Sequence, residues 1–175
     1  MITIEEKILR ICEEHKWPAV WFRLGCVVVK TADRVWQVRT PDDPCPNDVE
    51  ALGCSGWSFS GRLDWVGIDL DIGHGTDAYK DVATAIEDAR RFRDRRDGRA
   101  EIRLSKSGNG VHIRCLTGPG YTKDDAKKVV LGMMDCCWMK ADATPLGRQV
   151  FFLWARDLKP RAFELIEGHA GVEYE

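Results

Sequence analysis

The sequence contains no apolar run long enough to cross a membrane, because charged residues interrupt its hydrophobic stretches. A transmembrane helix needs roughly 20 consecutive apolar residues. The N-terminal stretch MITIEEKILRICEEH is acidic and amphipathic, and it lacks the basic and apolar regions of a signal peptide. We therefore expect a cytoplasmic protein that has no membrane partner.

The sequence also lacks a strong net charge and a paired cysteine motif. Its formal net charge of −2 argues against bulk adhesion to nucleic acid, so any polyanion contact must come from local basic patches. The seven cysteines are odd in number and scattered, as expected of small buried residues in a reducing compartment. Cys45 and Cys54 share a loop, but no C-x-x-C pair or second ligand pair accompanies them, and zinc is not expected.

Neither an internal repeat nor a low-complexity segment divides the chain. A length of 175 residues, with 44% hydrophobic and 31% charged residues, is typical of one soluble globular domain. We expect residues 1–60 to form an N-terminal α/β unit packed on a core formed by residues 61–175. The first unit would contain a helix at 3–15, which opens with a T-x-x-E capping box, strands at 19–30 and 34–39, and a long loop at 40–60.

An acidic strand begins the second part of the chain, in the stretch WVGIDLDIGHG at residues 65–75. Its even positions are apolar and its odd positions are small or acidic, which predicts a strand with one apolar and one open face. Asp69 and Asp71 would share the open face, where two close carboxylates are costly unless a cation lies between them. Hard carboxylate oxygens suit Mg²⁺ or Mn²⁺. The alternative is an exposed strand face with two solvated aspartates.

The elements that follow predict an α+β fold with a βαββαβ unit of the RNA-recognition-motif or ferredoxin-like type, preceded by the N-terminal α/β extension. Periodicity places a helix at 76–96, strands at 100–105 and 111–116, a helix from Thr122, and strands at 149–154 and 162–166. Right-handed crossovers put strand 111–116 antiparallel beside the acidic strand, and strand 149–154 on the other edge of the acidic strand.

This topology gathers polar residues on one open sheet face. His112 and Arg114 would face the same side as the two aspartates, and Asp142 would arrive near Asp71, although Asp135 and Asp157 compete with Asp142 for that role. The preceding turn, SKSGNG at 105–110, offers backbone N–H groups, hydroxyls and an ammonium that suit phosphate oxygens. Its alternative is an ordinary glycine-rich hairpin turn.

The stretch GIDLDIG, followed downstream by SGNGVHI and then by a late acidic residue, resembles the three motifs of the archaeo-eukaryotic primase superfamily. The resemblance covers about residues 65–167 and is strongest to the polymerase domains of bacterial end-joining ligases and to primase-polymerases of viruses and plasmids. It implies a DNA primase or polymerase, a nucleotidyltransferase that adds nucleotides to a strand in a template-directed, two-metal reaction with Mg²⁺ or Mn²⁺.

The same resemblance implies a role for each matching position. Asp69, Asp71 and Asp142 would hold the metals and act in catalysis together with His112. Ser107 and His112 would contact the nucleoside triphosphate, and Lys106 and Arg148 would assist. The implied partners are a DNA template and primer, nucleoside triphosphates, and a helicase or other replication protein.

Two other functions remain open from the residues alone. A metal-dependent nuclease would use the same aspartates to activate water, although the SGNG turn and His112 suit a triphosphate better. A non-catalytic nucleic-acid-binding module would use an RNA-recognition-like sheet, but such sheets usually carry aromatic residues where this sequence has Asp and His. The arginines at 90–99 and the lysines at 123–128 are either a template surface or solvated helix faces.

Overall fold

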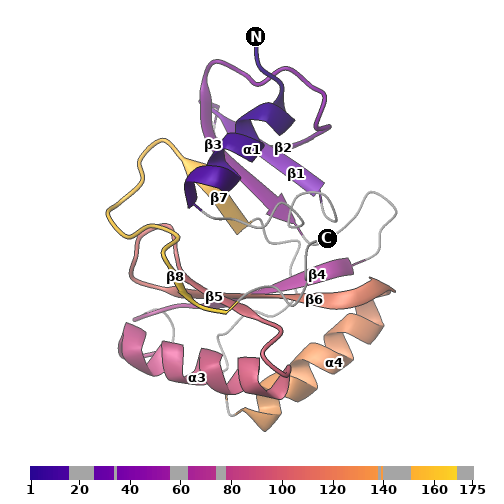
Figure 1. Cartoon of the computed structure of the whole chain (residues 1–175), viewed down its shortest axis with the longest axis vertical. Coiled ribbons are helices and arrows are strands. Elements are labelled where there is room, and N and C mark those ends of the chain that lie inside the picture. Colours follow the sequence, from indigo (N-terminus) through magenta and orange to yellow (C-terminus); the bar gives the residue numbers. More distant parts are fainter. Residues whose placement is uncertain are drawn as a thin grey trace.

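The computed structural model describes residues 1–15, 26–33, 35–55, 63–73, 78–137, 139 and 151–168. Within these ranges the protein is α+β, with two antiparallel four-stranded sheets and three helices (Figure 1). None of the helices in these ranges is long and apolar enough to span a membrane. The mixed α+β class predicted from the sequence is therefore confirmed.

The first sheet has the strand order β2-β1-β3-β7 and packs with the N-terminal helix α1 (Ile4–His15). Its strands are β1 (Cys26–Thr31), β2 (Trp36–Arg39), β3 (Val49–Ser55) and β7 (Phe151–Ala155). The predicted capping box begins α1, since Thr3 N donates to Glu6 Oε2 at 2.8 Å and Glu6 N donates to Thr3 Oγ1 at 3.1 Å. These bonds satisfy two N–H groups that a helix start leaves unpaired.

The second sheet has the strand order β4-β6-β5-β8 and carries two helices on one face (Figure 1). Its strands are β4 (Leu63–Leu70), β5 (Glu101–Leu104), β6 (Val111–Tyr121) and β8 (Leu165–Glu167), and its helices are α3 (Val82–Arg95) and α4 (Lys123–Cys136). Ile68 lies opposite Ile113 in the antiparallel β4–β6 pair. The predicted position of strand 111–116, between the acidic strand and strand 100–105, is confirmed.

The predicted position of the strand at 149–154 is wrong. The strand forms as β7, but β7 pairs with β3 in the first sheet instead of flanking β4. Its inward residue Leu153 is fully buried in the hydrophobic core that α1, β1 and β3 share. The complete RNA-recognition-motif unit is therefore not confirmed. The predicted division of the chain into residues 1–60 and 61–175 stays a prediction, although β3 and β7, which come from different sides of this boundary, share one sheet.

The predicted loop at 40–60 contains a central strand that the sequence analysis missed. Residues Val49–Ser55 form β3, between β1 and β7. All but one of these seven residues are buried, so the strand is covered on both faces and its sequence lacks a period of two. Two aromatic residues of the predicted loop, Trp57 and Phe59, could by sequence either stack on bases or pack in the core, and they lie outside the described residues.

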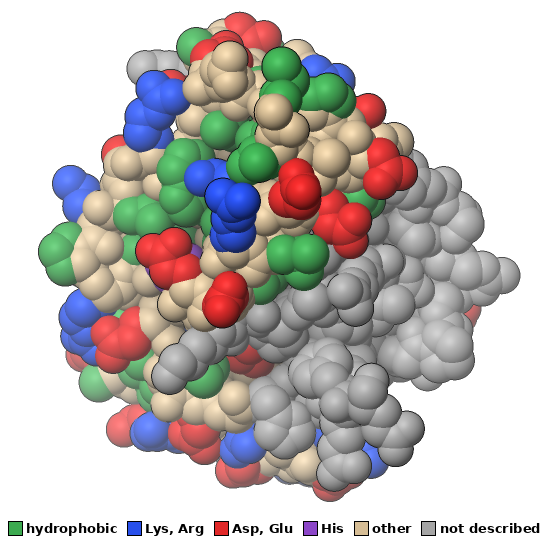
Figure 2. All heavy atoms as spheres, turned by 45° about the horizontal axis from the view of Figure 1, so that its top comes forward, with side chains coloured by type: hydrophobic (Ala, Val, Ile, Leu, Met, Phe, Trp, Pro, Cys, Tyr) green, Lys and Arg blue, Asp and Glu red, His purple; other side chains and the backbone are tan. Residues whose placement is uncertain are grey.

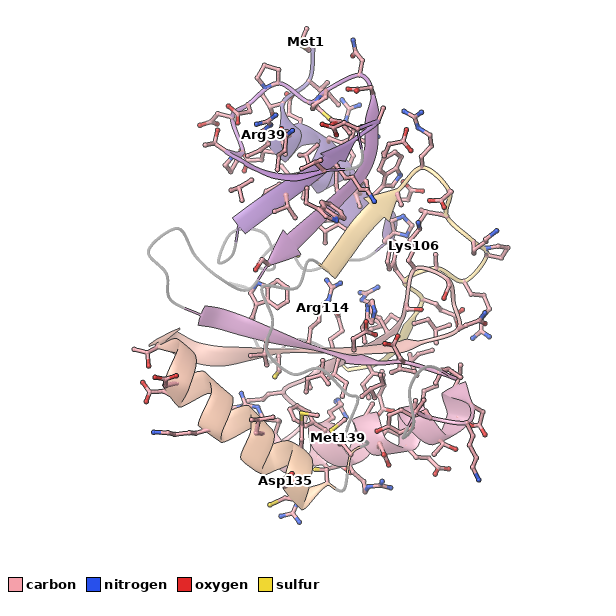
Figure 3. The ribbon with its side chains drawn as sticks, turned by 180° about the vertical axis from the view of Figure 1, so that it is seen from behind. Met1, Arg39, Lys106, Arg114, Asp135 and Met139 are labelled. Atoms are coloured by element: carbon pink, nitrogen blue, oxygen red, sulfur yellow. The ribbon has the colours of Figure 1, made fainter. Side chains whose placement is uncertain are left out.

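Two hydrophobic cores lie on opposite faces of the second sheet. One fills the space between β4–β6 and the helices, and it includes Ile68, Ile113 and, from α3, Phe92. The other joins the first sheet and α1 to residues such as Trp65 and Phe163. The face that was predicted to be open is thus turned toward the first sheet (Figures 1 and 3), and that prediction is corrected.

Candidate functional site

The β4–β6 register places Asp69 directly opposite His112. His112 Nε2 lies 3.3 Å from Asp69 Oδ1, and the histidine side chain is only 9% exposed whereas that of Asp69 is 34% exposed. The carboxylate therefore orients the imidazole and still reaches solvent. The sequence-based prediction that put these two residues on one face agrees with this geometry.

Asp71 lies one residue beyond the end of β4, with an exposed side chain. A short parallel bridge fixes its backbone, because Tyr79 N donates to Asp71 O at 3.3 Å and Gly73 N donates to Tyr79 O at 3.0 Å. Tyr79 is itself held by a bond from its hydroxyl to buried Asp88. Asp71 thus sits at the solvent end of the strand on which Asp69 lies.

The turn at 105–110 adjoins the end of β4. A Cβ on Gly110 would lie 3.1 Å from Ser105 Oγ and 3.5 Å from the Leu70 carbonyl, so a larger residue would crowd this approach. Gly108 has a φ of +77°, which glycine adopts without strain. Four N–H groups of the turn already have partners. Ser105 N and Gly108 N donate to the carbonyls of Gly110 and Ser105, and Gly110 N and Asn109 N donate to the hydroxyls of Ser105 and Ser107. A bound phosphate would have to exchange with these hydroxyls.

Lys106 projects from this turn and forms an ion pair with Asp157, at 2.7 Å between Nζ and Oδ1. Ser107, the residue beside it, is exposed. Asp157 and Asp135 are the two sequence alternatives to Asp142 for the third acidic position. Asp157 lies at the turn, whereas Asp135 is exposed on α4, far from Lys106 (Figure 3). Asp142 and Arg148 lie outside the described residues.

A buried ionic layer, which the sequence analysis missed, lies on the same face of the sheet. Arg103 and Glu101 are each 2% exposed and pair through Nε and Oε1 at 2.8 Å. Arg103 Nη1 also donates to the carbonyls of His15 and Phe163, at 3.0 and 2.9 Å. The β5–β6 register puts Arg103 beside His112. The alternation in EIRL, Glu101–Leu104, was the available signal, because it places both charges on the face of His112.

Arg114 completes this layer and touches the first core. Its guanidinium carbon lies 5.8 Å from the Trp65 ring centroid, within the range of a cation–π contact. Burial lowers the pKa of Arg114, while nearby Cys54 and Glu101 act in the opposite direction. Burial likewise raises the pKa of Cys54 to about 12, so this residue remains a neutral thiol. The layer is protein interior. Among the described residues of the site, Asp69, Asp71 and the turn reach solvent, and they form its rim.

The donor set at this rim suits a hard cation. Asp69 is partly exposed and Asp71 is exposed, and carboxylate oxygens are the ligands that Mg²⁺ and Mn²⁺ prefer. Among the residues that the structure describes, no group of three or more His, Cys, Asp or Glu side chains is arranged to hold a metal. The third predicted ligand, Asp142, is not among these residues.

Three of the four arginines of α3 form ion pairs with acidic side chains. Arg90 and Arg93 pair with Glu167 of β8 at 2.6 and 3.1 Å, and Arg91 pairs with Asp88. The contacts of Arg90 and Arg93 with Glu167 fasten the helix to the edge of the second sheet, which favours a structural role for these two arginines over a template surface. Figure 2 likewise shows basic and acidic side chains interspersed over the face that it presents.

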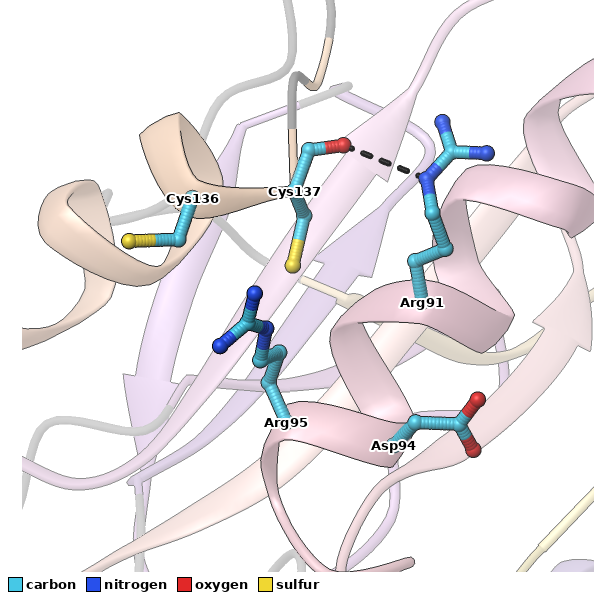
Figure 4. A pocket seen from close by; sticks show the side chains of 5 residues that line it. All are labelled: Arg91, Asp94, Arg95, Cys136 and Cys137. Carbon is cyan, nitrogen blue, oxygen red and sulfur yellow. Dashed lines mark hydrogen bonds between the residues drawn. The ribbon is translucent and has the colours of Figure 1, made fainter.

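A pocket of about 260 Å³ lies between α3 and α4, on the other side of the sheet from Asp69 and His112 (Figure 4). The residues that line it are Arg91, Asp94, Arg95, Cys136 and Cys137. Arg91 Nε donates to the Cys137 carbonyl at 3.3 Å, next to the C-terminal end of α4, where cations are favoured. This contact joins the two helices and has no part in the site on the opposite face.

Comparison of the chain with models of protein families and with curated proteins gave no match, so the assignment of a function rests on the site itself.

Proposed function

We propose that the protein is a primase-polymerase-type nucleotidyltransferase, which adds nucleotides to a DNA strand opposite a template. The observation that carries the proposal is the juxtaposition of Asp69, His112 and the turn at 105–110 at one end of the β4–β6 pair. An acidic pair, an oriented imidazole and a serine- and glycine-rich turn are the groups that the resemblance to the primase superfamily assigns to metal and triphosphate binding.

Phosphoryl transfer depends mainly on neutralising charge and on placing the attacking and leaving oxygens in line. Asp69 and Asp71 would hold Mg²⁺ or Mn²⁺, with Asp142 as a further ligand, and such ions, when bound, activate a hydroxyl and stabilise the charge of the transition state. His112, held by Asp69, and Ser107 would contact the triphosphate. Lys106 and Arg148 would add positive charge around the triphosphate. The partners of the protein would be a primed DNA template and a replication protein such as a helicase.

The covered sheet face weighs against the alternative of a non-catalytic RNA-recognition-type module. Such modules stack bases on aromatic residues of an open sheet. In this protein the corresponding positions include Glu101, Arg103 and Arg114, which are at most 2% exposed beneath the first sheet. A single-stranded nucleic acid could not lie on these side chains without separation of the two sheets.

The test is primer extension by the full chain, with primed and unprimed DNA templates, labelled dNTPs or NTPs, and Mn²⁺ or Mg²⁺. We expect the Asp69→Asn/Asp71→Asn variant to lose activity by roughly a hundredfold or more, because groups that stabilise transition-state charge are worth at least this much. Asp135→Asn, which removes an exposed carboxylate of α4, is the matched control and should retain activity.

The outcomes separate the candidate functions. Extension by the parent protein and the control alone would support the polymerase, and products on the unprimed template would show priming. A shortened template would indicate the nuclease instead. Equal extension by the parent and the double aspartate variant would contradict the proposed site.

A further inference from the structure

The segment that follows β7, residues 156–164, runs along the turn at 105–110. Phe163 N donates to the Ser105 carbonyl at 3.4 Å, and a Cβ on Gly108 would lie 3.4 Å from the Pro160 carbonyl. Together with the ion pair between Lys106 and Asp157, these contacts attach the turn to a distant part of the chain. The turn is therefore supported from one side, unlike an isolated hairpin turn.

The backbone of this segment is fixed in an uncommon conformation. Arg161 and Phe163 have φ values of +66° and +59°, in the left-handed region that bulky side chains rarely adopt. A bulky residue keeps this backbone conformation only where contacts with the surrounding structure hold it in place. Phe163 meets this condition, since its side chain is 1% exposed in the first core and its carbonyl accepts from Arg103. The segment thus provides a rigid support beside the turn.

Asp157 presents its carboxylate to the turn from this support. Its side chain is 75% exposed, and that of Lys106 is 31% exposed. The hydrogen bond from Lys106 lowers the pKa of Asp157, so the carboxylate is ionised at neutral pH. An ammonium has three N–H donors, so Lys106 can bond to this carboxylate and to phosphate oxygens at the same time.

We propose that Asp157 is a positioning residue, which directs the ammonium of Lys106 toward the phosphates of a nucleotide bound at the turn 105–110. The proposal rests on the proposed function, since it concerns the same nucleotide. The competing explanation is a surface ion pair with no role beyond its small contribution to stability. The two explanations differ in whether removal of the Asp157 charge changes nucleotide affinity.

The test measures equilibrium binding of a Mn²⁺-dNTP complex to the full chain, together with the KM and kcat of primer extension. Asp157→Asn keeps the shape of the side chain and removes its charge. We expect Kd and KM for the nucleotide to rise roughly three- to tenfold, as expected when one charge-assisted contact is weakened, with kcat and the urea unfolding midpoint nearly unchanged. Glu164→Gln is the matched control, because it breaks the exposed Arg161–Glu164 ion pair in the same segment.

Lys106→Gln and the double variant complete a cycle. If Asp157 acts through Lys106, the double variant should bind no more weakly than Lys106→Gln alone. Fully additive losses, or a Kd for Asp157→Asn equal to that of the parent, would overturn the positioning role. If the parent protein binds the nucleotide and the Asp69→Asn/Asp71→Asn variant does not, failure of the positioning role leaves the proposed function standing. Absence of nucleotide binding by the parent protein overturns both the positioning role and the proposed function.

Discussion

Replacement of Arg103 by methionine should destabilise the fold strongly, because this side chain joins three parts of the molecule. It pairs with Glu101 inside the second sheet, and it donates to the carbonyls of His15 at the end of α1 and of Phe163 in the segment before β8. Methionine has a similar length and no charge, so the variant removes the polar contacts with little loss of packing volume.

The expected loss follows from burial of both charged partners. Removal of one partner of a buried ion pair costs about 3–5 kcal/mol, since the remaining charge is left uncompensated. The neighbouring guanidinium of Arg114 interacts favourably with Glu101 and offsets part of this cost. The two carbonyl groups, deprived of their donor, each add about 1 kcal/mol. We therefore expect the free energy of unfolding to fall by about 4 kcal/mol, a large part of the 5–15 kcal/mol typical of a domain.

Urea unfolding followed by tryptophan fluorescence measures this change. The control is Glu101→Gln/Arg103→Met, in which no unpaired carboxylate remains, and it should recover part of the lost stability. A loss below about 1 kcal/mol for Arg103→Met would refute the reasoning, because an exposed ion pair contributes no more than that. In that case the face of the second sheet that carries Arg103 would have to be accessible to water.

The remaining predictions concern the capping box and the thiols. Thr3→Ala should lower the free energy of unfolding by about 1 kcal/mol through loss of the α1 cap, and an unchanged urea midpoint would contradict this. Exposed Cys136 should react with iodoacetamide at pH 8 before buried Cys54, whose pKa burial raises to about 12; mass spectrometry would show the order, and early labelling of Cys54 would argue against its burial. Because the pKa of Cys54 is higher in the folded than in the unfolded state, stability should decline as pH rises from about 9 toward 12. Cys54→Ser should show a shallower decline in urea midpoints over this range, whereas equal slopes would exclude the thiol as a cause.

Local patterns predicted most of the elements and, in the second sheet, the position of β6 between β4 and β5. The period of two in WVGIDLDIGHG and in VHIRCL predicted which residues face α3 and α4. The short turn at 105–110 predicted that the strands on either side of it, β5 and β6, pair with each other. Asp69 and His112 could therefore be placed on one face of adjacent strands by sequence pattern alone, and the register puts them opposite each other. Likewise, the capping box predicted the start of α1 to within one residue.

The errors concern which surfaces cover one another, which a local pattern does not encode. The stretch QVFFLW contains a strand that could pair with any free strand edge. Pairing with β3 buries Leu153 in the core of the first sheet. The stretch that forms β3 contains Gly53 and Cys54 and follows a proline-rich segment, so it resembles a loop although both of its faces are buried. Glu101 and Arg103 resemble solvent-facing charges because the sequence does not show that the first sheet lies above them.

The pairing of β7 with β3 also constrains the order in which the chain can fold. β3 ends at Ser55 and β7 begins only at Phe151, so the first sheet cannot be completed until nearly the whole second sheet and its helices have been synthesised. Until then, one edge of β3 lacks its partner strand and the core of the first sheet lacks Leu153. Contacts so distant in sequence form slowly, because a long loop must close before they are gained. Assembly of the first sheet is therefore a late event, during which the nascent chain is most exposed to aggregation and proteolysis.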